Sequence, residues 1–185
     1  MTMTVLNKET LWEGKFLRAV LIKYSDGAGK TRTWEAVERV GCDGIVAIVP
    51  FTDEGMVLII RQFRPPVNGY VVELPAGLCD RGEKFEDAAR RELLEETGYS
   101  AKEMKFLTEG PISSGLSSEM LSVFAATGLV YVGIGDRDET EHIEVLKVHP
   151  DSFYSRLDEM QKAGDYIDMK IYGFFELAKK RLREK

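Results

Sequence analysis

Cysteine is scarce in this sequence, with Cys42 and Cys79 the only two. They lie far apart, and neither belongs to a pattern with the spacing of zinc ligands. The sequence therefore indicates neither a disulfide framework nor a structural zinc site. Reduced thiols of this kind are typical of a cytoplasmic protein.

Long apolar runs and a basic charge balance are also absent. No stretch approaches the roughly 20 apolar residues of a membrane-spanning helix, and residues 1–7 lack the basic and apolar regions of a secretory leader. The net charge of -6 disfavours non-specific binding of nucleic acid, which requires a basic surface. We expect a cytoplasmic protein without membrane or nucleic-acid partners, although bound cations and local arginines could still hold a nucleotide.

Apolar residues make up 44% of the 185 residues, enough for the core of a globular domain. Short β-branched segments between turn residues predict strands at 16–24, 31–40, 45–49, 56–63, 71–74, 120–126 and 143–148. Longer periodic stretches predict helices at 84–97, 151–163 and 167–183. The expected fold class is α+β, with an N-terminal β subdomain (residues 1–42) tied closely to a catalytic domain (residues 43–185).

The helix predicted at 84–97 carries an unusual concentration of carboxylates. Glu92, Glu95 and Glu96 project within an arc of about 100° on the less exposed side of the helix, which they share with small apolar residues. Like charges four residues apart destabilise a helix, and partial burial increases their repulsion. A bound Mg²⁺ or Mn²⁺ ion would relieve it. On spacing alone, a solvated acidic face with Arg91 as a local partner explains the pattern equally well.

The segment around this helix resembles the signature of the Nudix hydrolase superfamily at every fixed position. The matching residues are Gly77, Glu83, Arg91-Glu92-Leu93, Glu95-Glu96 and Gly98-Tyr99, separated by five, seven, one and one residues. The resemblance implies a loop-helix-loop within a mixed β-sheet sandwich flanked by helices. It also implies that Glu92, Glu95, Glu96 and the Ala76 carbonyl are metal ligands, and that Glu83 and Arg91 brace the loop.

Three further strings, GKTRTWE, RQFRPPVNGY and ELPAGL, resemble the branch of the superfamily that cleaves ADP-sugars such as ADP-ribose. In that branch an N-terminal strand region is exchanged between two subunits, and its aromatic residues sandwich the adenine. The resemblance therefore implies a homodimer. Trp34 matches one such aromatic residue, and Phe16 stands where related enzymes have a second tryptophan. Ordinary packing on a strand face is the alternative for both residues.

Polar residues near the aromatic pair must select the base, because stacking itself accepts any base. Glu35 and Arg39 are the candidates. Arg64 offers a two-pronged donor to a phosphate, with a surface ion pair as its alternative. Leu78, within the ELPAGL string, completes the predicted substrate-binding residues.

The loop after the signature departs from the branch. Related enzymes commonly have a proline directly before Gly-Leu or Gly-Phe, where this sequence has Ser113-Ser114-Gly115-Leu116 and a displaced Pro111. GDP-mannose, UDP-sugars and dinucleotides therefore stay open as substrates beside ADP-ribose. A different class of function is a ligand-sensing module that binds without turnover, but such a module has no need for three mutually repelling carboxylates.

The expected reaction is Mg²⁺-dependent attack of water on one phosphorus, which converts ADP-ribose to AMP and ribose 5-phosphate. The candidates for the carboxylate that activates the water are Glu119, Glu139 and Glu141. Glu141 is favoured because the branch carries a catalytic glutamate two residues before the first apolar position of the strand at 143–148. A solvated acidic loop is the alternative. The predicted catalytic residues are thus Glu141, Glu92, Glu96, Arg91 and Glu119.

Overall fold

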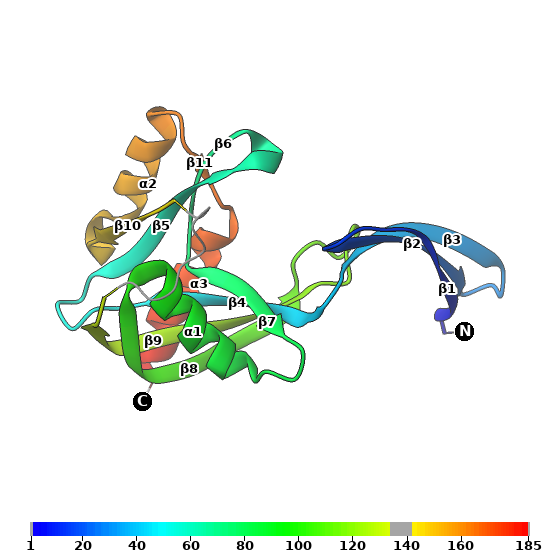
Figure 1. The fold of residues 1–185 in the computed structure, drawn as a ribbon, viewed down its shortest axis with the longest axis horizontal. Coiled ribbons are helices and arrows are strands. Elements are labelled where there is room, and N and C mark those ends of the chain that lie inside the picture. Colours follow the sequence, from blue (N-terminus) through cyan, green and yellow to red (C-terminus); the bar gives the residue numbers. More distant parts are fainter. Residues whose placement is uncertain (1, 134–141, 185) are drawn as a thin grey trace.

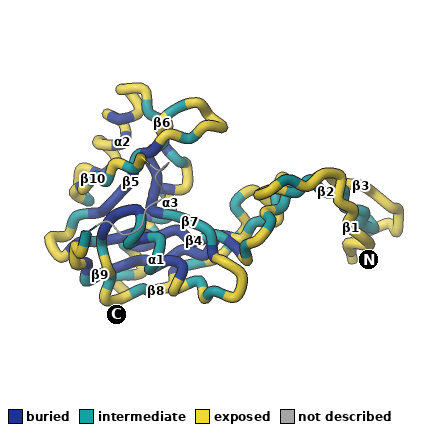
Figure 2. The backbone as a smooth tube through the Cα atoms, viewed as in Figure 1, coloured by how far each residue is buried: buried dark blue, intermediate teal, exposed yellow. Residues whose placement is uncertain are grey.

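The computed structural model describes residues 2–133 and 142–184, which form a compact body and a projecting arm (Figure 1). The arm is an antiparallel sheet of β1 (Thr4–Glu13), β2 (Leu17–Ser25) and β3 (Thr31–Arg39). Val20 is the single buried residue among those described in the arm, whose surface is otherwise exposed or half-buried (Figure 2). The arm therefore has almost no core within one chain.

The first sheet of the body has the strand order β7-β4-β9-β8. Its members are β7 (Ala76–Asp80), β4 (Cys42–Pro50), β9 (Met120–Tyr131) and β8 (Tyr99–Pro111). β4 and β9 run parallel, and the other neighbours are antiparallel. The parallel pair places β4, from the start of the domain, beside β9, which follows the acidic helix.

The second sheet has the order β10-β5-β6-β11. It consists of β10 (Ile143–Val148), β5 (Val57–Arg64), β6 (Gly69–Glu73) and the short β11 (Tyr166–Ile167). β11 pairs with β6 in parallel, and the other pairs are antiparallel. A 3₁₀ turn, η1 (Pro65–Val67), connects β5 to β6.

The apolar run of β4 explains its central place, because a strand buried on both faces reads as a continuous hydrophobic segment. Val46 and Ile48 belong to the core that packs against α1 (Phe85–Thr97). Ala47 and Val49 belong to the opposite core, which also contains residues of the C-terminal helices. The strand thus joins two layers of core, with α1 on one side.

The C-terminal helices are α2 (Phe153–Lys162), preceded by the 3₁₀ turn η2 (Pro150–Ser152), and α3 (Lys170–Arg183). Phe153 of α2 and Phe175 of α3 are fully buried, and their rings stack with centroids 3.8 Å apart. Both rings belong to the core that contains Ala47 and Val49, so both helices pack against it. None of the described helices is long and apolar enough to cross a membrane.

The α+β fold class, the acidic helix and all seven predicted strands are confirmed, with shifts at their ends. Four strands were not predicted: β1, which is exposed along its whole length, β7, β8 and the short β11. The helix predicted from 167 is wrong at its start, because Ile167 pairs with Val72 in β11 and the helix begins only at Lys170. The helix predicted from 151 begins instead at Phe153, after a 3₁₀ turn.

Candidate active site

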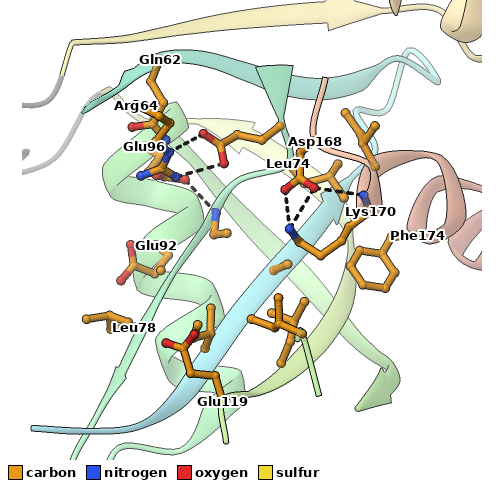
Figure 3. Close-up of a pocket in the computed structure, with 18 of the residues that line it drawn as sticks. Gln62, Arg64, Leu74, Leu78, Glu92, Glu96, Glu119, Asp168, Lys170 and Phe174 are labelled. Carbon is orange, nitrogen blue, oxygen red and sulfur yellow. Dashed lines mark hydrogen bonds and ion pairs between the residues drawn. The ribbon is translucent and has the colours of Figure 1, made fainter. Parts of the chain in front are cut away.

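A pocket of about 600 Å³ lies where both sheets, the acidic helix and the start of α3 meet. Its walls carry acidic and basic side chains from distant parts of the chain, and Figure 3 shows them converging on the space in front of α1. The charged members are Arg39, Arg64, Glu73, Asp80, Arg91, Glu92, Glu96, Glu119, Asp168 and Lys170. Such a lining suits a small ligand that carries several charges.

Glu96 is the most deeply placed carboxylate of the pocket, with 5% of the residue exposed. The Ala76 backbone N–H donates to its Oε2 at 2.9 Å. Burial raises the pKa of the Glu96 carboxyl to about 8; the Ala76 hydrogen bond opposes this shift, and the negative charge of Glu92 adds to it. The helix that positions Glu96 ends directly after it, with Gly98 in the left-handed conformation at φ 77°.

Glu92 lies one turn before Glu96 and packs directly against Gly77 of β7. A Cβ atom at position 77 would lie 1.9 Å from the Glu92 Cδ, which is closer than any real contact. Any side chain at position 77 would therefore displace the Glu92 carboxylate from its place beside β7.

Arg91 connects the helix to the loop before it. Its guanidinium donates to both oxygens of Glu83, at 3.1 and 3.0 Å, and to the Leu78 carbonyl at 2.9 Å. The same group donates to Glu92 at 2.7 Å and Glu95 at 3.1 Å. These bonds lower the pKa of Glu83 and raise that of Arg91.

The donors around α1 fit a divalent cation in their chemistry. Glu92 and Glu96 supply hard carboxylate oxygens, and Ala76 lies beside them on β7. Within residues 2–133 and 142–184, no three acidic, histidine or cysteine side chains are gathered as in a preformed metal cluster. The Arg91 guanidinium bonds one carboxylate oxygen of Glu92 and one of Glu95, and an ionised carboxylate has two oxygens that can accept a donor or bind a cation.

Arg64 reaches the pocket from the end of β5. Glu73 of β6 accepts two hydrogen bonds from it, at 2.7 and 3.0 Å, so the ion-pair alternative is present in the structure. The pair nevertheless lies in the pocket wall, with 43% of the Arg64 side chain exposed. Arg64 is therefore positioned for the phosphate contact that the sequence predicts.

The other predicted site residues fall into two groups. Arg39 and Glu119 form an ion pair and both line the pocket, as does Leu78. Phe16, Trp34 and Glu35 are instead exposed residues of the arm or its edge, outside the pocket lining. Of the two candidates for base selection, Arg39 lines the pocket and Glu35 does not.

Trp34 is held by its indole Nε1, which donates to the Gly115 carbonyl at 3.0 Å. It also lines a shallow hollow with Tyr24, Ile22 and Val5. Glu139 and Glu141 lie outside the described residues.

Several pocket residues were not predicted from the sequence: Gln62, Glu73, Asp168 and Lys170. Gln62 carried a usable signal, because residues two apart on a strand face the same side and Arg64 was already a candidate. Asp168 accepts from the backbone N–H of Lys170 at 3.0 Å and pairs with its ammonium group. No local sequence pattern predicts that the start of α3 lies at the pocket.

Comparison with known proteins agrees with this architecture. The model of the NUDIX domain matches residues 43–167. An ADP-ribose pyrophosphatase of Bacillus subtilis (strain 168) is 37% identical over 142 residues, covering 76% of this chain and 75% of the relative. An ADP-sugar pyrophosphatase of Mus musculus is 31% identical over 190 residues, covering 92% and 84%.

The same fold occurs in a solved crystal structure of an ADP compounds hydrolase, with a TM-score of 0.80 and 23% identity. The match covers 100% of this chain and 96% of that one. The chain belongs to the Nudix family and is a Nudix hydrolase. Hydrolases of this family generally use divalent metal ions, in agreement with the carboxylate donors on α1.

Proposed function

We propose that this hydrolase cleaves the pyrophosphate bond of a nucleoside diphosphate sugar in a Mg²⁺-dependent reaction, with ADP-ribose converted to AMP and ribose 5-phosphate. The observation that carries the proposal is the acidic face of α1, where Glu92 and the buried Glu96 line a pocket that also holds Arg64. Relatives named as ADP-ribose and ADP-sugar pyrophosphatases support the substrate class.

In this proposal Glu92, Glu95, Glu96 and the Ala76 carbonyl would hold Mg²⁺, or Mn²⁺ in its place. The bound ion would supply positive charge to the phosphates and lower the pKa of water. Arg64, oriented by Glu73, would donate to a phosphate oxygen in a fixed direction. Arg91, bonded to Glu83 and to the Leu78 carbonyl, would keep α1 in register with the preceding loop and with β7.

A nucleotide-sugar panel tests the substrate assignment. Purified protein with Mg²⁺ is incubated with ADP-ribose, GDP-mannose, UDP-glucose and a dinucleotide, and the products are measured. The highest kcat/KM is expected for ADP-ribose, and ¹⁸O water identifies the phosphorus that is attacked. A higher kcat/KM for another compound would reassign the substrate, and tight ADP-ribose binding without any product would favour a sensing module.

The general base is proposed to be Glu141. Glu141→Gln is expected to lower kcat by about a hundredfold with little change in KM, because the carboxylate removes a proton only during the reaction. Glu139→Gln should be milder. Glu119 is paired with Arg39 in the pocket wall, so Glu119→Gln should have an intermediate effect. Steady-state kinetics of the three variants identify the base. A larger loss of kcat in Glu119→Gln than in Glu141→Gln would place the base in the earlier loop.

We also propose a homodimer in which residues 1–42 form an exchanged subdomain. The exposed arm, with almost no core of its own, supports this arrangement because a partner could cover its apolar residues. Phe16 and Trp34 would then belong to an aromatic clamp, assembled from both subunits, that sandwiches the adenine across the dimer, with Glu35 and Arg39 selecting the base.

Trp34→Ala is expected to raise KM for ADP-ribose about tenfold or more with a smaller change in kcat, since stacking on a base contributes about 1–3 kcal/mol. Trp12→Ala, which removes the other tryptophan of the exposed arm, is the matched control. Light scattering of both variants separates a lost dimer from a lost base contact. An active monomer would refute the shared clamp, and an unchanged KM in Trp34→Ala would return Trp34 to ordinary packing.

A further inference from the structure

Gln62 lines the pocket but has no role in the site as described so far. It lies on β5, two residues before Arg64, so that both side chains leave the strand on the same side. Figure 3 shows the two side chains on the pocket side of the strand. Ile60, two residues earlier on the same face, is fully buried and apolar. The polar Gln62 thus stands between the core and the charged part of the pocket.

The carboxamide of Gln62 is buried without a hydrogen-bond partner for its nitrogen. The residue is 7% exposed. Over the described parts of the chain, its Nε2 is the one buried side-chain nitrogen or oxygen that has no partner. Buried polar groups in native proteins are nearly always paired, and an unpaired donor destabilises the folded state. A methionine of similar length would fill this position without that loss.

The surroundings of Gln62 define what could complete its hydrogen bonding. Arg64 is oriented by two bonds to Glu73, and Glu96 lies near enough for its pKa to respond to the Arg64 charge. A ligand oxygen that approaches Arg64 would come within reach of Gln62, because the terminal torsion of glutamine turns easily. A neutral amide can donate a hydrogen bond to an anion. It would not form an ion pair with the carboxylates of α1, whereas a lysine or arginine at the same position would.

We propose that Gln62 is a substrate-binding residue whose amide group donates a hydrogen bond to a pyrophosphate oxygen, beside the contact made by Arg64. The proposal rests on the proposed function only through the pyrophosphate group, which every nucleoside diphosphate sugar carries. It therefore applies whichever base and sugar the enzyme selects. A pyrophosphate oxygen in the pocket would accept the hydrogen bond for which the Gln62 Nε2 has no acceptor within the described residues.

The test compares Gln62→Met and Gln62→Glu with Gln161→Met, which changes the exposed glutamine of α2. Calorimetry measures binding of a non-hydrolysable α,β-methylene analogue of ADP-ribose in Mg²⁺, and thermal unfolding is measured without ligand. For Gln62→Met we expect about tenfold weaker binding, with an unfolding temperature equal to or above that of the wild type. Gln62→Glu should bind still more weakly, because its carboxylate repels the phosphates. Gln161→Met should match the wild type.

If Gln62 only stabilises the fold, the results for binding and for unfolding should both be reversed. If Gln62→Met unfolds at a lower temperature and binds the analogue as tightly as the wild type, the proposal is overturned. This failure differs from failure of the proposed function. In the latter case, the wild type would bind the analogue but cleave no nucleotide sugar, and the Gln62 comparison would still hold.

Discussion

Replacing Glu92 or Glu96 with glutamine is expected to lower kcat by about a thousandfold or more while the protein stays folded. Each change keeps the shape of the side chain but removes a negative charge from the proposed cation site. Glu96→Gln retains an oxygen that can accept the Ala76 N–H, so the local structure should persist. The expected readouts are steady-state kinetics under saturating Mg²⁺ and circular dichroism.

The matched control is Glu86→Gln, which changes an exposed carboxylate on the first turn of the same helix. Glu86 pairs with Arg90 at the surface, where an ion pair contributes little to stability. This variant should keep wild-type kinetics. Near wild-type turnover in Glu92→Gln or Glu96→Gln would show that the ligand assignment is wrong.

Without metal, the protein is expected to lose stability as the pH rises from about 4.5 to about 8. Over this interval the folded protein keeps the Glu96 proton, whereas the unfolded chain, with its ordinary pKa of 4.5, has released it. The folded state therefore binds more protons, and the free energy of unfolding falls with increasing pH. Because one pKa unit corresponds to about 1.4 kcal/mol, the contribution of Glu96 is on the order of a few kcal/mol.

Thermal unfolding of the metal-free protein between pH 5 and pH 9 measures this effect. Glu96→Gln should show a shallower decline and be the more stable protein above pH 8, where Glu96 is ionised in both states of the wild type. Added Mg²⁺ should stabilise the wild type increasingly as the pH rises, because it binds the ionised carboxylate. Identical pH profiles for the wild type and Glu96→Gln would contradict the raised pKa.

The acidic helix was predictable because its information is local. The period of α1 determines which carboxylates share a face, and the fixed spacing from Gly77 to Gly98 identifies the family signature. The continuous apolar segment of β4 likewise predicted a buried strand. By contrast, the exposed β1 carries no apolar alternation along its length, and it was missed for that reason.

The sequence by itself determined the α+β class, the acidic helix and which of its carboxylates share a face, because residue type and spacing specify these within a short segment. Only the tertiary structure decided how deeply Glu96 is buried, and hence its raised pKa. It alone also brought Asp168 and Lys170 to the pocket. These features depend on which strands pair and where α3 begins, and local periodicity does not specify contacts between segments far apart in the chain.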